Sequence, residues 1–468
     1  MLDVARHYMP VADIHRLLDA AALCGLNRMH WHLTDDQGWR VEIRRFPKLT
    51  EIGARRGRSF FGAVPELENN EGFYTQDEIR EIVAYAQAKG IEIIPEIEVP
   101  GHASAMLAAY PEYGCARSAV RDGRIARMDR PYNFHVTTSS GIFPNLICAG
   151  KDEAVCFLEA ILDEIVELFP GPMVHIGGDE ALKLHWRRCP DCQKRMREEG
   201  LENEEALQRW LVLKIGDYLA EKGKKVVVWN ESLAGGLLPK HFIVQHWLGN
   251  DAETAAFMAQ GGQVIVSDTN YYYFDYAYST IDVYRLFNAP LVPDYARGHE
   301  DQLLGVECPL WTERITNLRR ASRMLYPRLA AVALRLNGES SASWEDFRGV
   351  LAAQMEKLSP LGLEVAPESY WRMSPEDAAA ERAEEERLNH SPEADAANAE
   401  ERQMLVQEVF EKRMRALNMS EVEALGIMDA LWRRGAPNYC GDTGSETSAQ
   451  ADESLERLLR KMKEEGTL

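Results

Sequence analysis

Short apolar runs alternate along the chain with longer segments in which apolar residues recur every three or four positions. Runs that are nearly continuous in Val, Ile and Leu are typical of parallel strands buried on both faces. The apolar runs are Leu2–Tyr8, Arg28–Leu33, Ile91–Ile97, Met173–Ile176, Lys225–Trp229, Phe242–His246, Gln263–Ser267 and Leu303–Val306. The helical patterns include Val11–Leu23, Asp77–Ala88, Glu153–Leu168 and Glu204–Glu221. Eight strand-then-helix units predict an α/β fold, a (β/α)8 TIM barrel that ends near residue 350.

The composition changes beyond about residue 365, where Ala- and Glu-rich helical patterns replace the alternation. We therefore expect a catalytic barrel over residues 1–365 and a C-terminal helical appendage of unknown role over residues 366–468. The helices expected in this second region are Ala378–Leu388, Glu393–Leu417, Ser420–Arg434 and Glu453–Glu464.

Polar and aromatic residues follow every one of the predicted strands. In a (β/α)8 barrel the loops at the carboxyl ends of the strands carry the chemistry, so these residues predict one shared site. In chain order they are Arg6, His30–Asp36, Glu96–His102, Asp179 and Glu180, Trp229–Glu231, Trp247, Tyr271–Asp275, and Trp311–Glu313.

The hexapeptide His175–Glu180 lies at the centre of this pattern. Two glycines end its apolar run, and two carboxylates, Asp179 and Glu180, follow with no residue between them. Neighbouring acids repel, which raises the pKa of one of them and gives a site an acid and a base at neutral pH. Glycine lets the backbone turn and come close to a ligand.

An acid pair beside strand-end tryptophans and tyrosines indicates glycoside hydrolysis. Aromatic rings pack against sugars, while Arg6, Asp275 and Glu313 would fix hydroxyl groups. Retaining glycosidases usually take carboxylates about 5 Å apart from different strands, and consecutive residues seldom meet that need. They suit substrate-assisted hydrolysis, in which the 2-acetamido oxygen of the sugar is the nucleophile. Glu180 would protonate the glycosidic oxygen, and Asp179 would orient the acetamido nitrogen.

Three motifs together resemble glycoside hydrolase family 20, the β-N-acetylhexosaminidases, over roughly residues 1–330. They are His175–Glu180, His30–Arg40 and Pro95–His102. The resemblance implies an exo-acting enzyme that removes terminal β-linked GlcNAc or GalNAc with retention, through an oxazolinium intermediate. It leaves open which of the two sugars is preferred.

The resemblance also implies a role for each candidate residue. Asp179 polarises the acetamido group, Glu180 is the general acid/base, and Asp35 and His102 form a relay beside Glu180. Tyr273, rather than Tyr271 or Tyr272, would hydrogen-bond the acetamido oxygen. The expected substrate-binding residues are Arg6, His175, Trp229, Trp247, Asp275, Trp311 and Glu313. The chain departs from the family pattern over Tyr276–Pro293 and at Leu334–Asn337, which bears on the last barrel helix.

Composition and charge limit the classes of partner that we expect the protein to bind. The net charge of -21 argues against nucleic acid and anionic lipid, because both require clustered basic residues. No apolar stretch reaches the roughly 18 residues of a membrane span, and no signal peptide is visible, so we expect a cytoplasmic protein. We expect a carbohydrate substrate with a terminal β-N-acetylhexosamine, and the resemblance allows a homodimer.

Cysteine is sparse, with 8 in 468 residues, which fits a reducing compartment. Cys189 and Cys192 have the spacing of a zinc or redox pair, but no second pair of that spacing follows, so we expect structural thiols, no metal and no cofactor. Cys115 and Cys148 would form a bridge only in an exported protein.

Two other functions fit parts of the sequence. His30, His32, His102, His175 and Asp179 have the residue types of a metal-dependent amidohydrolase barrel, although that family places its His-x-His pair after the first strand. Bound zinc would favour this alternative. A non-catalytic amino-sugar-binding barrel would keep the pocket without activity, and retained GlcNAc binding would reveal it.

Overall fold

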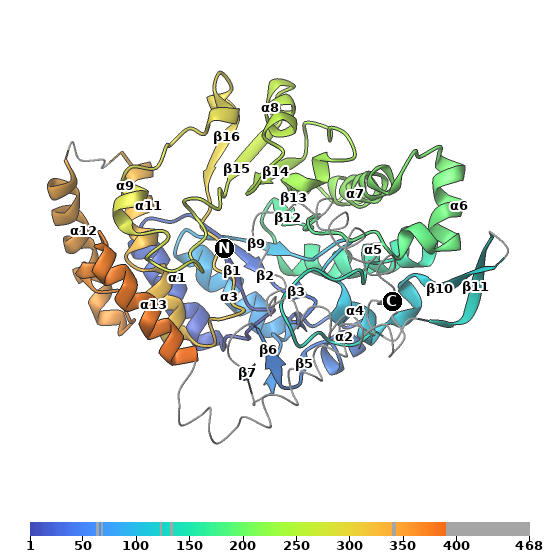
Figure 1. Ribbon diagram of the computed structural model, residues 1–468, viewed down its shortest axis with the longest axis horizontal. Coiled ribbons are helices and arrows are strands. Elements are labelled where there is room, and N and C mark those ends of the chain that lie inside the picture. Colours follow the sequence, from blue (N-terminus) through green and yellow to red (C-terminus); the bar gives the residue numbers. More distant parts are fainter. Residues whose placement is uncertain (62–64, 67–68, 122–123, 132–133, 339–342, 390–468) are drawn as a thin grey trace, which may run out of the picture.

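Eight parallel strands form one curled sheet in the computed structural model, which describes residues 1–61, 65–66, 69–121, 124–131, 134–338 and 343–389 (Figure 1). The strands follow the order of the chain: β1 (Leu2–Asp3), β2 (Arg28–His32), β9 (Glu92–Glu96), β12 (Met173–His175), β13 (Lys225–Trp229), β14 (Ile243–His246), β15 (Gln263–Val266) and β16 (Leu303–Val306). A parallel bridge between Leu2 and Leu310 joins the first strand to the segment after the last. The (β/α)8 barrel predicted from the sequence is confirmed.

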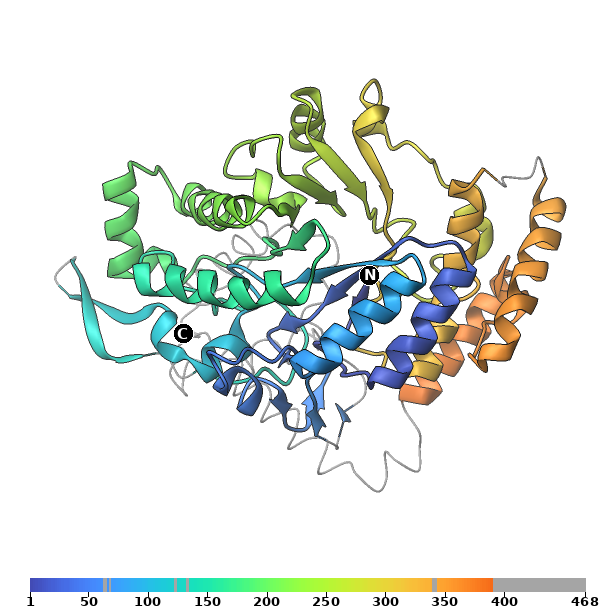
Figure 2. The ribbon, with the colours of Figure 1, turned by 180° about the vertical axis from the view of Figure 1, so that it is seen from behind.

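Helices cover the outside of the sheet. The described helices are α1 (Val11–Leu23), α2 (Lys48–Glu51), α3 (Gln76–Ala88), α4 (Ser104–Ala109), α5 (Asp152–Leu168), α6 (Pro190–Glu199), α7 (Glu204–Glu221), α8 (Asp251–Ala259), α9 (Val283–Phe287), α10 (Leu318–Leu325), α11 (Arg328–Leu336), α12 (Trp344–Leu358) and α13 (Pro375–Asn389). Figure 2 shows α1, α3 and α5 lying side by side. Their apolar residues recur at helical spacing, so each buries one face against the strands. Among the helices of the described chain, none combines the length and apolar character that crossing a bilayer requires.

The loops at the carboxyl ends of the barrel strands contain four short antiparallel strand pairs among the described residues. They are β3 (Thr34–Asp35) with β4 (Gly38–Trp39), β5 (Arg55–Arg56) with β8 (Asn70–Glu71), β6 (Ser59–Phe60) with β7 (Pro65–Glu66), and β10 (Ala116–Arg121) with β11 (Arg124–Pro131). The hairpin of β10 and β11 is part of the long connection from β9 to α5 and lies beside α6 (Figures 1 and 2).

Two local predictions were wrong. The first strand ends at Asp3 rather than Tyr8, because the Asp3 carboxylate accepts the backbone N–H groups of Ala5 and Arg6 at 2.8 and 3.1 Å and turns the chain out of the ladder. The fifth unit has no α-helix, since only a 3-10 turn, Asn230–Leu233, separates β13 from the loop that leads to β14. That loop is short and contains glycine and proline, which disfavour a helix.

The last barrel helix forms despite the departure from the family pattern at Leu334–Asn337. In α11 residues 330–334 are buried, whereas Leu336 at its end is exposed. The buried Arg328 side chain donates to the carbonyl groups of Tyr276 and Ile281 at 2.8 and 3.1 Å. Arg328 therefore fixes the loop after β15.

Beyond residue 365, Trp371 is buried in the main core, and Glu381 on α13 accepts the backbone N–H groups of Tyr278 and Ser279 at 2.9 and 2.6 Å. The helix expected at Ala378–Leu388 thus lies within α13. The division at residue 365 stays a prediction. The helices expected at 393–417, 420–434 and 453–464 lie outside the described residues.

A substitution of Asp3 tests how the barrel closes between its first strand and the segment after its last strand. Its Oδ2 accepts the backbone N–H of Thr312 at 3.0 Å, and the Arg6 guanidinium lies 3.1 Å away. Asp3→Ala leaves these buried donors without a partner, so we expect the free energy of unfolding to fall by about 3 kcal/mol. Urea unfolding measures this loss, with the exposed Asp217→Ala as the control. An unchanged midpoint for Asp3→Ala would contradict the assignment.

Candidate active site

The loop after β12 delivers Asp179 and Glu180 through a tight turn. A Cβ on Gly177 would lie 1.8 Å from Oε2 of Glu98, and one on Gly178 would lie 2.1 Å from Oγ of Ser232. Both glycines have positive φ, 66° and 98°. Glu180 itself has φ 46°, a conformation that is costly for a residue with a side chain and that is concentrated at functional sites. Only glycine fits the two positions that precede the acid pair.

His102 contacts both acids of the pair. Its Nε2 lies 3.7 Å from Oδ2 of Asp179 and 3.5 Å from Oε2 of Glu180. Its Nδ1 lies 3.2 Å from Oδ1 of Asp35 and 3.2 Å from Oδ2 of Asp36. Although burial opposes the charge, these carboxylates raise the pKa of His102 well above its ordinary value. The structure therefore brings the two residues of the expected relay, Asp35 and His102, together beside Asp179 and Glu180, with a charged imidazole in the middle.

Burial raises the pKa of both acids, to about 7 for Asp179 and about 8 for Glu180. Glu231 adds to the shift of each by charge repulsion, and its Oε2 accepts the Glu180 backbone N–H at 3.1 Å. At neutral pH Glu180 holds a proton that it can donate. Glu231, two residues after β13, was expected among the strand-end residues of the site, but no role was predicted for it.

Arg6 lies between the Asp35 carboxylate of the relay and a second group of acids, Asp275 and Glu313. Its Nη2 lies 2.7 Å from Oδ2 of Asp35, and its Nη1 lies 3.8 Å from Oε1 of Glu313. The guanidinium holds the pKa of Asp35 well below its usual range, against the effect of burial. Burial raises the pKa of Asp275 to about 8, and the nearby Glu313 contributes. Oδ1 of Asp275 is buried with no hydrogen-bond partner among the described residues, as expected of a group that binds a ligand hydroxyl.

Four aromatic side chains form a box beside the acid pair. Trp229, Trp247 and Tyr273 pack together in a buried cluster, with Trp311 against it. The rings of Trp247 and Tyr273 stack with centroids 5.9 Å apart, and Trp229 and Trp311 lie 6.0 Å apart. Asp179 is close enough to contribute to a raised pKa of the Tyr273 hydroxyl, behind the larger effect of burial. Of the three consecutive tyrosines, Tyr273 is the one in this box.

His175 lies beneath the box rather than in its opening. It is fully buried, and its Nδ1 lies 2.8 Å from Oε1 of Glu96. Glu96 also accepts the Trp229 indole N–H at 2.9 Å and a short hydrogen bond from Nδ1 of His32, and Nε2 of His30 lies 3.0 Å from it. Glu96 was expected among the strand-end residues, but its role as a central acceptor was not predicted. Its register partner on β2 is His32, which was the available signal.

The metal ligands of an amidohydrolase are not assembled here. Among the described residues, these histidines belong to separate groups that could each share an ion. His30 lies with Glu96 and His175, whereas His102 lies with Asp35 and Asp36. His30 and His32 bind the Glu96 carboxylate instead of facing Asp179. The five residues that suggested that chemistry therefore do not point to one position.

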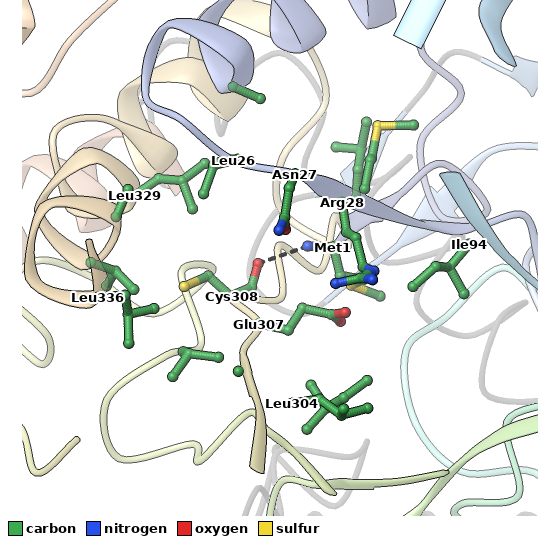
Figure 3. A pocket seen from close by; sticks show the side chains of 18 of the residues that line it. Met1, Leu26, Asn27, Arg28, Ile94, Leu304, Glu307, Cys308, Leu329 and Leu336 are labelled. Atoms are coloured by element: carbon green, nitrogen blue, oxygen red, sulfur yellow. Dashed lines mark hydrogen bonds between the residues drawn. The ribbon is translucent and has the colours of Figure 1, made fainter. Parts of the chain in front are cut away.

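A cavity of 620 Å³ opens at the opposite end of the barrel, among residues that begin the strands (Figure 3). Its lining is largely apolar and includes Met1, Ile94 and Leu304. Since chemistry in barrels of this kind occurs at the carboxyl ends of the strands, we assign the active site to the end that carries Asp179 and Glu180.

The cysteine prediction needs a correction. Cys189 and Cys192 were taken to lack a second pair, but the structure places two single cysteines, Cys115 and Cys148, beside them. Separate segments of the chain supply these two, so no spacing rule detects them.

Comparison with known proteins agrees with this geometry. Residues 1–336 match the family model described as "Glycosyl hydrolase family 20, catalytic domain". The chain belongs to glycosyl hydrolase family 20. A family 20 relative, a beta-hexosaminidase of Porphyromonas gingivalis, is 36% identical over 346 residues, which are 71% of this chain and 42% of that protein. The chain therefore spans less than half the length of this curated relative.

Solved family 20 structures share the fold. A beta-N-acetylhexosaminidase from Bacteroides fragilis superposes with a TM-score of 0.65 at 32% identity, covering 78% of this chain and 71% of that one. An exo beta-N-acetylglucosaminidase from Vibrio harveyi, in complex with N-acetylglucosamine, has a TM-score of 0.66 at 31% identity, covering 80% of this chain and 58% of that one.

Glu96→Gln tests the central acceptor. The Glu96 charge contributes to raised pKa values of about 9 for His30 and about 10 for His32, against burial, which lowers them. Without that charge we expect both pKa values to fall. Histidine NMR titration measures the change, and Glu92→Gln on the same strand is the control. Unchanged histidine titrations would show that other groups hold the charge.

Proposed function

We propose that the chain is an exo-acting β-N-acetylhexosaminidase that removes terminal β-linked GlcNAc or GalNAc by a retaining, substrate-assisted mechanism. The observation that carries the proposal is the acid pair itself: two adjacent carboxylates, Asp179 buried and Glu180 partly buried, both with raised pKa, beside an aromatic box. Family membership and relatives named as hexosaminidases support the same activity.

In the first step the acetamido carbonyl oxygen attacks the anomeric carbon while the bond to the leaving group breaks. Glu180 gives its proton to the departing oxygen, and the sugar becomes an oxazolinium ion. Asp179 accepts the acetamido N–H and stabilises the positive charge that develops on the ring. Its Oδ1 has no hydrogen-bond partner among the described residues and so is available for this contact.

The aromatic box would hold the acetamido group of the sugar close to the anomeric carbon. Trp229, Trp247 and Trp311 would enclose the acetamido methyl group, and the Tyr273 hydroxyl would donate to the acetamido oxygen. Holding the nucleophile against the anomeric carbon removes most of the entropic cost of reaching the reactive geometry.

In the second step water attacks the anomeric carbon from the face that the leaving group left. The Glu180 carboxylate takes a proton from that water, the oxazolinium ring opens, and the configuration is retained. The charged His102, held by Asp35, stabilises Glu180 as an anion between the two steps. Arg6, Asp275 and Glu313 would bind the hydroxyl groups at positions 3, 4 and 6 and close the pocket at the end of the sugar chain.

The first test compares nitrophenyl β-N-acetylglucosaminide with nitrophenyl β-glucoside. Only the acetamido sugar carries its own nucleophile, so we expect it alone to be hydrolysed. Asp179→Asn should lower kcat by about 100-fold, because it cannot stabilise the oxazolinium charge. The exposed Asp217→Asn is the matched control.

Wild-type rates for Asp179→Asn would refute substrate assistance. If neither glycoside is cleaved and calorimetry still detects N-acetylglucosamine binding, the non-catalytic sugar-binding barrel is the better reading.

The pH profile of kcat/KM tests the assignment of acid and base. Glu180 acts protonated, and with a pKa of about 8 it loses that proton as the pH rises, so activity should fall above pH 8. Asp179 acts ionised, and with a pKa of about 7 it gains a proton as the pH falls, so activity should fall below pH 7. We expect a narrow bell between these limits.

Glu180→Gln should abolish the alkaline limb on a substrate with a good leaving group, which needs no acid. A limb that persists in this variant would assign the acid to another residue.

A further inference from the structure

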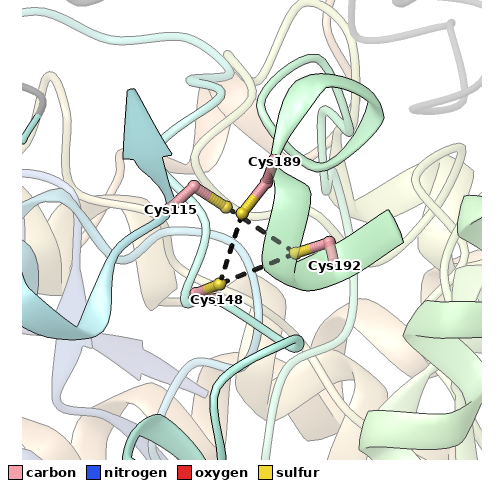
Figure 4. A group of neighbouring side chains, drawn as sticks. All are labelled: Cys115, Cys148, Cys189 and Cys192. Carbon is pink, nitrogen blue, oxygen red and sulfur yellow. Dashed lines mark hydrogen bonds between the residues drawn. The ribbon is translucent and has the colours of Figure 1, made fainter. Parts of the chain in front are cut away.

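Four cysteine side chains meet in one buried cluster outside the active site (Figure 4). Cys115 precedes β10, Cys148 lies four residues before α5, Cys189 caps the start of α6, and Cys192 lies in its first turn. Two of these residues come from the connection between β9 and α5, and two come from the connection that follows Asp179 and Glu180. All four sulfurs lie within 4.8 Å of one another.

The sulfur separations match those of thiolates around a single ion. The Sγ atoms lie 3.9 Å apart for Cys115 and Cys192, 3.7 Å for Cys148 and Cys189, and 3.6 Å for Cys148 and Cys192. With zinc–sulfur bonds of about 2.3 Å in a tetrahedron, neighbouring sulfurs stand about 3.8 Å apart. Cys148 and Cys192 each have two sulfur neighbours at nearly equal distance, so the cluster does not divide into two disulfide pairs.

Contacts other than those between the sulfurs hold the segments in this arrangement. A Cβ on Gly150 would lie 2.1 Å from the backbone carbon of Asp191 and 2.2 Å from the backbone nitrogen of Cys192, so two backbones touch there. The backbone N–H of Cys148 donates to the carbonyl of Tyr113 at 2.9 Å. The Trp186 indole donates to the carbonyl of Ile147 at 3.0 Å.

We propose that Cys115, Cys148, Cys189 and Cys192 bind one structural Zn²⁺. The four thiols release their protons to solvent, and four zinc–sulfur bonds form. Four protein ligands close the coordination shell, which leaves no position for a reacting water, so the ion is structural rather than catalytic. The site has a net charge of -2. The ammonium group of Lys151 donates to the carbonyl of Gly114, the residue before Cys115, at 2.6 Å.

The ion would join the β10–β11 hairpin, the approach to α5 and the start of α6. The last of these is the continuation of the chain from the acid pair, and eight residues separate Glu180 from Cys189. A zinc clamp here would anchor the far end of the loop that carries Asp179 and Glu180, so removal of the metal should loosen that loop without touching the acids themselves.

Metal content of the full-length chain, purified without chelator, is the direct test. We expect one zinc per chain by mass spectrometry of the metal, and loss to background in Cys148→Ser and Cys192→Ser. The melting temperature of both variants should fall. Cys156→Ser, at an exposed position on α5, and the buried Cys24→Ser should each retain the full zinc content.

Exchange with cobalt keeps the test informative if the serine variants fail to fold. Wild-type protein loaded with Co²⁺ should show sulfur-to-cobalt charge-transfer absorption and the visible bands of a tetrahedral ion. Zinc at background with all four thiols reactive, or disulfides among the four, would overturn the proposal. The readout is metal content, so it stands or falls independently of the hydrolase activity.

Discussion

The Glu96 carboxylate is fully buried, yet it stays ionised because three histidines and an indole surround it. A carboxylate in a barrel interior is costly unless nearby charges and donors compensate for lost water. Here the compensating groups come from β2, β12 and β13, so one side chain ties four strands of the sheet together, including its own β9. The same contacts fix the ring of Trp229, which is one wall of the aromatic box. The geometry of the site therefore depends on a charge that does not face the substrate.

The active site beside Glu96 contains many carboxyl groups, and the surroundings of each one decide whether it is ionised. Asp35 is held by Arg6 and His102 and carries its charge easily. Asp179, Glu180 and Asp275 lie where burial and neighbouring acids raise their pKa values. The result is a set of carboxyl groups that titrate in the range where an enzyme needs both an acid and a base.

The sequence was sufficient to place the seven strands after the first to within one residue at each end, because buried parallel strands leave continuous apolar runs. It also predicted that the candidate site residues lie together at one end of the barrel, since parallel strands align their carboxyl ends. Where it failed, single side chains overrode the pattern: Asp3 turns the first strand out of the sheet. The roles of Glu96 and Glu231 and the partners of Cys189 were not predicted, because they arise from contacts between distant segments, which periodicity does not record.

The two glycines before the acid pair have a consequence for how this site can change. At Gly177 and Gly178 there is no room for even a methyl group, so the loop after β12 offers no freedom for mutational drift. The opposite wall differs, since Leu248, Tyr276 and Glu313 are only partly buried. Diversification of substrate preference would therefore accumulate in the loops after β14, β15 and β16, while the catalytic loop stays unchanged for steric reasons alone.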